Sequence, residues 1–114
     1  MGTDTALITA AGEIDAANAD EFREHITDAL VRGKHLALDL SQLKFFGTEG
    51  FSALHRISVR CAEADVRWAM VPGAEVRRVL RICDPEGNLP AVDAVDEAMA
   101  VVRGSRPLLA VVSH

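Results

Sequence analysis

The side chains best placed to do chemistry lie at one turn, Gly47-Thr48-Glu49-Gly50. Before it, the stretch 36–40 alternates apolar residues with a period of two, which predicts a strand with one buried face. After it, apolar residues follow a period near 3.6, so a helix is expected to begin near Thr48. The Thr48 hydroxyl can cap that helix or accept a phosphate, and Glu49 places a carboxylate at the positive end of the helix dipole. The sequence therefore predicts a helix start suited to negative charge.

Arrangements typical of catalysis are absent from the sequence. The histidines have no mutual spacing that suggests metal ligation or a nucleophile with its base: His25, His35, His55 and His114. No glycine-rich loop carries the lysine and hydroxyl that hold phosphates in nucleotide-binding proteins. A phosphate-accepting receiver domain would need an acidic pair and a further aspartate at strand ends, and only Asp15 and Asp39 are loosely so placed. We therefore expect a protein that is not an enzyme and binds no cofactor or metal.

Charge and composition narrow the function further. Seventeen acidic and twelve basic residues give a net charge of −5, which opposes binding to nucleic acid. No run approaches the ~20 apolar residues that cross a bilayer, and the start lacks the pattern of a secretory signal. Cys61 and Cys83 each fall on the apolar stripe of an expected helix, where a reduced thiol fills the core. We expect the 114 residues to form one cytoplasmic domain without nucleic-acid or membrane partners.

Strands and helices are predicted to alternate along the chain. Strands are expected at 6–14, 35–40, 66–71 and 89–92, and helices after Asn18, Thr48, Pro72 and Asp93. Asn18 followed by Glu21 resembles a capping box, and Asp93 is expected to cap the last helix. The alternation predicts an α/β fold with parallel strands and right-handed helical crossovers. For residues 104–114, which contain the run LLAVV, an added edge strand, a partner-binding segment and an unpacked tail stay open.

Three segments, in their order and spacing, resemble the STAS domain, the module shared by bacterial anti-sigma-factor antagonists and the cytosolic tails of sulfate transporters. They are Gly12-Glu13-Ile14-Asp15, the stretch from Leu38 to Phe51, and Val76-Arg77-Arg78-Val79-Leu80. The resemblance implies an α/β fold with a small, mostly parallel sheet of about four strands and about four helices packed largely on one side. It also implies protein recognition rather than catalysis. The short N-terminus departs from the family, which usually places another strand before the Gly12 strand.

The resemblance also gives the turn a specific meaning. In the antagonist branch the turn reads Asp-Ser-Ser-Gly, and an anti-sigma factor with a kinase-like fold phosphorylates the second serine. The dephosphorylated antagonist then captures that anti-sigma factor and frees the sigma factor. Here the tetrad is Gly47-Thr48-Glu49-Gly50, so Glu49 stands at the phosphoacceptor position. The resemblance therefore implies a kinase-like anti-sigma factor as partner and a phosphoswitch that is lost or altered.

Three roles for Glu49 follow from its charge. A solvated glutamate carries one negative charge at neutral pH, whereas phosphoserine carries about 1.5 to 2. In the first role, Glu49 holds the chain in a state resembling the phosphorylated, released form. In the second, it contacts a basic residue of the partner and makes binding independent of phosphorylation. In the third, it does no more than stabilise the helix start.

Residues around the tetrad complete the expected contact surface. Of Phe45 and Phe46, one is expected in the core and the other as an exposed aromatic contact, and Phe46 is assigned to the contact set. Ser52 lies on the polar side of the expected helix, and Asp15 resembles a family position near the partner surface. The expected site is Asp15, Phe46, Gly47, Thr48, Glu49, Gly50 and Ser52. A different function on the same fold, a scaffold or small-ligand sensor acting through self-association as a homo-oligomer, stays open.

Overall fold

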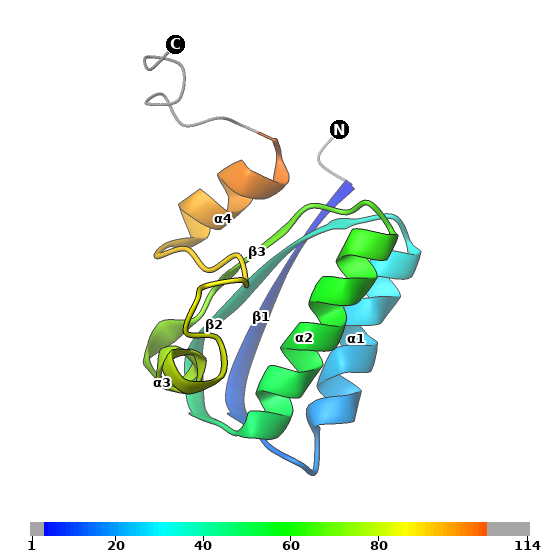
Figure 1. The fold of residues 1–114 in the computed structure, drawn as a ribbon. Coiled ribbons are helices and arrows are strands. Elements are labelled where there is room, and N and C mark those ends of the chain that lie inside the picture. Colours follow the sequence, from blue (N-terminus) through cyan, green and yellow to red (C-terminus); the bar gives the residue numbers. More distant parts are fainter. Residues whose placement is uncertain (1–3, 105–114) are drawn as a thin grey trace, which may run out of the picture.

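A computed structural model describes residues 4–104, and within them three strands combine with four helices (Figure 1). In chain order these are β1 Thr5–Ile14, α1 Ala19–Val31, β2 His35–Phe46, α2 Thr48–Glu63, β3 Trp68–Val71, α3 Gly73–Cys83 and α4 Val95–Val102. The strands form one parallel sheet in the order β1-β2-β3. The α/β class and the parallel sheet expected from the alternating pattern are confirmed.

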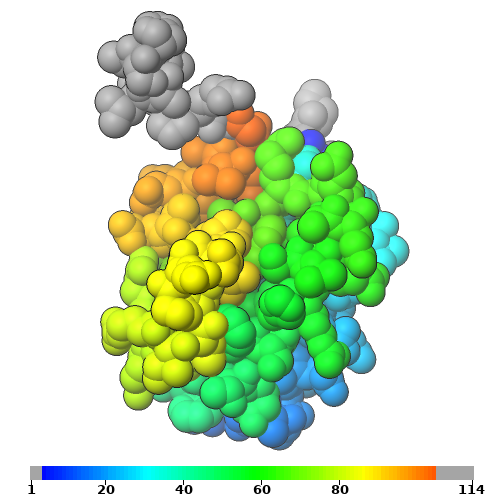
Figure 2. Space-filling view, viewed as in Figure 1, coloured from blue at the N-terminus to red at the C-terminus, as the bar shows by residue number. Residues whose placement is uncertain are grey.

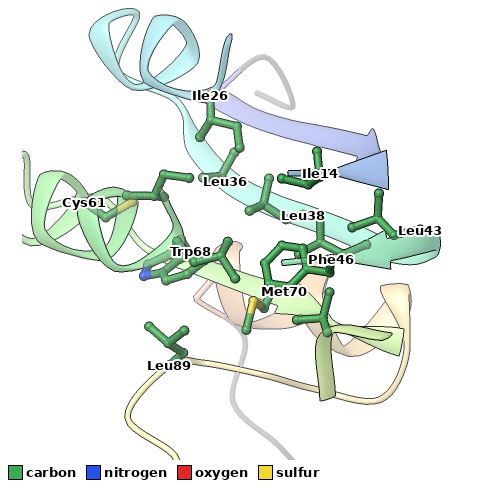
Figure 3. Packing of buried hydrophobic residues seen from close by; sticks show 14 of the residues in the cluster. Ile14, Ile26, Leu36, Leu38, Leu43, Phe46, Cys61, Trp68, Met70 and Leu89 are labelled. Atoms are coloured by element: carbon green, nitrogen blue, oxygen red, sulfur yellow. The ribbon is translucent and has the colours of Figure 1, made fainter. Parts of the chain in front are cut away.

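The two faces of the sheet bury different side chains, because successive strand residues point to opposite sides. Leu36, Leu38 and Met70 lie in the larger of two hydrophobic clusters, together with residues of α1 and α2 (Figure 3). Ala37 and Ala69 lie in the smaller cluster, which α4 completes. Full burial of one large apolar side chain contributes roughly 1.5–3 kcal/mol, so both clusters favour the folded state. Helices α1 and α2 therefore cover one face of the sheet and α4 covers the other.

Helix α3 packs against β2 and adds Val76 to the larger cluster. Three of the four helices thus share one cluster, as expected for helices packed largely on one side. At the start of α3, Gly73 has φ +75, a conformation that favours glycine. A Cβ atom at this position would lie 2.5 Å from Ser41 Cα. The missing side chain therefore allows the backbone of α3 to approach the backbone of β2.

The expected strand at 89–92 is reduced to one parallel bridge, between Met70 and Ala91. Met70 donates its N–H to the Pro90 carbonyl at 2.9 Å and accepts from the Val92 N–H at 2.8 Å. Pro90 has no N–H of its own and cannot extend a ladder. The described residues therefore contain three strands rather than about four, and the segment after α3 only extends the edge beyond β3.

Helix starts also differ from the sequence expectations. Gly47, in extended conformation, is the N-cap of α2 and Thr48 is its first helical residue, so the expected capping role of Thr48 is wrong. Asn18 is the N-cap of α1, but its side chain makes no bond to the free N–H groups of that helix. It donates instead to the Glu13 carbonyl at 2.8 Å and accepts from the Asp15 N–H at 2.9 Å. The expected capping box is therefore wrong.

The start of α4 shows the same kind of difference. Ala94 is the N-cap, and the Asp93 carboxylate accepts a hydrogen bond from Arg77 of α3 at 2.6 Å. The expected cap by Asp93 is therefore wrong. Asn18 and Asp93 both have side chains that can cap a helix, but Asn18 bonds to the backbone of the turn before α1 and Asp93 to a side chain of α3. Sequence spacing alone does not show such partners.

The described part of the chain contains two free cysteines and no helix that is long and apolar enough to span a bilayer. Cys61 is buried in the larger cluster, and burial raises the pKa of its thiol to about 11, which keeps the thiol protonated at neutral pH. Cys83 is half-buried at the end of α3. The core role expected for Cys61 is confirmed. The LLAVV run lies outside the described residues.

Candidate functional site

The expected site lies where β1 and β2 end. Ile14 and Phe46 are register partners at the last position of the two strands, and the Gly47 N–H donates to the Ile14 carbonyl at 3.0 Å. The strands are parallel, so the turn after β1 and the turn after β2 emerge at the same edge of the sheet. In the space-filling view the two turns lie together at the lower end of the molecule (Figure 2). The fold therefore brings Asp15 and the tetrad to one region.

The β2–α2 turn presents Thr48 and Glu49 to solvent, since both residues are exposed. Backbone N–H groups in the first turn of a helix lack intrahelical acceptors and form the positive end of the dipole. The Glu49 carboxylate folds back over this turn, with Oε1 only 2.7 Å from the place that a Cβ atom of residue 47 would occupy. The structure thus places a negative group at the helix start, as the sequence predicts.

Phe46 and Gly50 hold this turn from the inside. Phe46 is only 4% exposed and belongs to the larger core cluster. A Cβ atom on Gly50 would lie 2.4 Å from Phe46 Cε1, so the glycine lets the first turn of α2 rest on the ring. The assignment of Phe46 to the contact surface is therefore wrong, because its side chain is inside. The exposed aromatic residue is Phe45, 47% exposed, whose ring lies beside Gly47.

A shallow groove of about 210 Å³ runs between the starts of α1 and α2. Its walls come from both helices and from the turn before α1: Ala16, Ala19, Asp20, Arg23, Glu49, Ser52, Ala53 and Arg56. Half of these side chains are small, and the other half, two carboxylates and two guanidinium groups, supply the charge. The Asp20 Oδ1 and Arg23 Nη2 atoms are 3.9 Å apart and form an ion pair on α1. The groove can therefore accept a partner side chain between groups of both signs.

Of the residues expected in the site, Glu49 and Ser52 line this groove. Asp15 is beside it and shapes the turn, because its carboxylate accepts the Ala17 N–H at 2.9 Å and its carbonyl accepts the Ala19 N–H at 2.9 Å. Asp15 therefore stabilises the turn between β1 and α1. Its proposed contact with a partner stays a prediction, as does that of Thr48.

Sequence reasoning missed the contribution of α1, namely Asp20 and Arg23. Their spacing of three residues is common on any exposed helix and gives no sign of a groove. Arg56 is on the same exposed side of α2 as Ser52, which the helical period does predict. Only the packing of α1 beside α2 brings these groups together.

Fold and groove together describe a small α/β domain with a charged candidate site at the carboxyl ends of its parallel strands. Residues 2–98 match the family model of the STAS domain. The chain therefore belongs to the STAS domain family, and the family expected from its three sequence segments is confirmed.

Comparison with individual proteins agrees with this membership. Osmosensory protein A of Mycobacterium tuberculosis is 34% identical over 97 residues, which are 82% of this chain and 61% of that protein. The chain thus spans about three-fifths of that relative. An anti-sigma factor antagonist from Mycobacterium paratuberculosis superposes with a TM-score of 0.77 at 22% identity, covering 88% of this chain and 86% of the other. The unphosphorylated anti-sigma factor antagonist SpoIIAA gives a TM-score of 0.68 at 20% identity, covering 89% and 91%. The fold is therefore that of anti-sigma factor antagonists.

Proposed function

We propose that this chain is a non-enzymatic, cytoplasmic regulator that binds an anti-sigma factor with a kinase-like fold. Its recognition surface comprises Thr48, Glu49, Ser52 and Arg56 of α2, the neighbouring Asp15 turn, and Arg23 of α1 across the groove. Membership of the STAS family and the fold shared with anti-sigma factor antagonists support this function. The observation that carries it is the exposed Glu49 carboxylate, held at a helix start on the rim of a charged groove.

The usual phosphoswitch is lost or altered in this proposal. Glu49 occupies the position of the phosphoacceptor serine in the antagonists that this chain resembles. It supplies one negative charge, whereas phosphoserine supplies about 1.5 to 2. Arg23 and Arg56 line the same groove, so their positive charges face any anionic group of a partner. We favour a contact role for Glu49, with binding independent of phosphorylation, because the carboxylate is exposed and hydrogen bonds to a partner's cation are strong.

Affinity capture tests this function. Wild type, Glu49→Ser and Glu49→Ala are immobilised, exposed to host lysate and analysed for a retained anti-sigma factor of kinase-like fold. Glu63→Ala is the matched control, because it removes a carboxylate from the other end of α2. We expect wild type and the Glu63 variant to retain the factor and Glu49→Ala to retain less. Retention only by the serine and alanine variants would show instead that Glu49 locks the released state. No retention by any form would contradict the proposed function.

A second candidate function, a scaffold or sensor acting through self-association, is favoured by the edge of the sheet. Among residues 4–104, strand β1 pairs only with β2, and its residue Leu7 is 49% exposed. An edge strand with free N–H and carbonyl groups is a template for pairing with another chain. A molecular mass that rises with concentration in light scattering, together with no retained anti-sigma factor, would support this function over the first.

A further inference from the structure

The glycine at position 47 has no backbone explanation. Gly47 has φ −91 and ψ 177, extended backbone that any residue adopts. In this it differs from Gly73, whose φ of +75 favours glycine. Gly47 is also the N-cap of α2, where glycine is about as acceptable as threonine but supplies no side-chain acceptor for the helix N–H groups. Left-handed backbone is therefore not a reason for glycine here, and the space beside the residue supplies another one.

That space is occupied by Glu49. A Cβ atom at position 47 would lie 2.7 Å from Glu49 Oε1 and 3.4 Å from Phe45 Cε2. The first distance is shorter than van der Waals contact, so a side chain at 47 and the present position of the Glu49 carboxylate exclude each other. The carboxylate ends a flexible side chain and can move away at little energetic expense. Substitution at 47 would therefore relocate the charge rather than disrupt the fold.

The position of the Glu49 carboxylate matters because it lies at the start of α2. An N-cap side chain would normally accept hydrogen bonds from the first N–H groups of the helix. Gly47 provides none, and the Glu49 carboxylate lies where such a side chain would begin. A favourable interaction with the dipole falls off within the first turn, so a displaced carboxylate would lose part of it. The displaced group would also face a partner from a different place on the groove rim.

We infer that Gly47 is a positioning residue for Glu49: its missing side chain lets the carboxylate fold back over the start of α2, and the two residues set the charge of the recognition surface as one unit. This inference deepens the proposed function and, for partner binding, rests on it. The substitution Gly47→Ala therefore acts on recognition through Glu49 and has no effect of its own once Glu49 is removed.

A double-mutant cycle tests the unit with wild type, Gly47→Ala, Glu49→Ala and the double variant. The first measurement is the dissociation constant for the anti-sigma factor retained in the capture experiment. We expect Gly47→Ala to change it about fivefold when Glu49 is present and less than about twofold when residue 49 is alanine. A control cycle uses Glu63→Ala in place of Glu49→Ala. In that cycle Gly47→Ala should still change the dissociation constant about fivefold, because Glu49 is present. An equal effect of Gly47→Ala in both Glu49 backgrounds would overturn the inference.

The second measurement needs no partner. In NMR spectra of the wild type we expect a nuclear Overhauser effect between the Glu49 γ-protons and the Gly47 α-protons, and its loss in Gly47→Ala. Persistence of this effect in the variant would overturn the positioning role. If no anti-sigma factor is retained, the proposed function fails, but the NMR result still decides whether Gly47 positions Glu49. The two failures are thus distinguishable.

Discussion

Two strand-to-helix turns, β2–α2 and β3–α3, emerge at the same edge of the sheet and use glycine for different reasons. At the β3–α3 turn, Gly73 has φ +75 and a Cβ atom would lie 2.5 Å from Ser41 Cα, which is backbone. At the β2–α2 turn, Gly47 has ordinary extended backbone, and a Cβ atom would meet the end of the Glu49 side chain at 2.7 Å. Backbone cannot yield, whereas a flexible carboxylate can. Gly73 thus determines stability, and Gly47 determines the place of a charge.

Gly50 is intermediate between these two glycines. A Cβ atom at this position would lie 2.4 Å from the ring of Phe46, which is a side chain but a buried one. The ring is packed in the core and has less freedom to move than an exposed carboxylate. The comparison therefore predicts a graded series of effects on substitution, from strong loss of stability to a change in recognition alone.

The largest effect is expected for Gly73→Ala. Left-handed backbone costs a non-glycine residue about 1–2 kcal/mol, and the clash with Ser41 adds to it, so we expect a loss of about 3 kcal/mol in the free energy of unfolding. Urea denaturation measures this. Gly87→Ala is the matched control, since Gly87 has φ +69 but nothing within 4 Å of its Cβ position, and should lose only about 1 kcal/mol. Equal losses of unfolding free energy in the two variants would show that the close approach of α3 to the β2 backbone does not require glycine at position 73.

Gly50→Ala should come next, with a loss of about 1–3 kcal/mol, because the added methyl group overpacks the Phe46 ring. Thermal or urea unfolding measures it. The double variant Phe46→Leu with Gly50→Ala should lose less than the two single losses added together, because leucine leaves room for the methyl group. Strict additivity would show that the Phe46 contact is not what requires glycine at position 50.

Glu49→Lys should separate recognition from stability. We expect the affinity for the anti-sigma partner to change by more than about 1 kcal/mol, because the charge at the rim of the groove is reversed. Glu49 is exposed, so the free energy of unfolding should change by less than about 1 kcal/mol, mainly through the helix dipole. Isothermal titration calorimetry and urea denaturation measure the two quantities. A large loss of stability with unchanged affinity would assign Glu49 to the fold alone.

Gly47→Ala should have the smallest effect on stability, less than about 1 kcal/mol, because the residue it meets can move. Urea denaturation of this variant beside Gly73→Ala gives the direct comparison of the two turns. A loss as large as that of Gly73→Ala would mean that the β2–α2 turn has no more freedom than the β3–α3 turn, and would contradict the distinction between them.

The sequence predicted most of the fold because burial follows local periods. Alternating leucines located the first half of β2, which continues beyond the expected end at residue 40 to Phe46. The 3.6 period located α2, and the succession of strands and helices implied parallel strands. The predictions failed where a side chain had a choice of partners. The Asn18 side chain bonds to the Glu13 carbonyl and the Asp93 side chain to Arg77, and neither side chain makes a capping hydrogen bond. Cap residues are recognised by type, but the hydrogen bond they make depends on what the fold places beside them.

For the candidate site, the tetrad and its exposed Glu49 followed from sequence, as did Ser52 on the polar side of α2. Which phenylalanine faces the core did not follow, because Phe45 and Phe46 are adjacent and the strand ends at that point. Asp20 and Arg23 were missed, since their place in the groove depends on how α1 packs beside α2.

The sequence by itself determined the order of strands and helices, the STAS family and the negative charge at the start of α2, because each depends on residue types and on their order and spacing along the chain. Only the tertiary structure decided that the Asp15 turn meets the tetrad, that Arg23 shares a groove with Glu49, and that Gly47 makes room for a carboxylate. The first two are contacts between separate segments of the chain, and the third depends on how the backbone turns between β2 and α2. Their distances are set by packing in three dimensions, which local patterns do not contain.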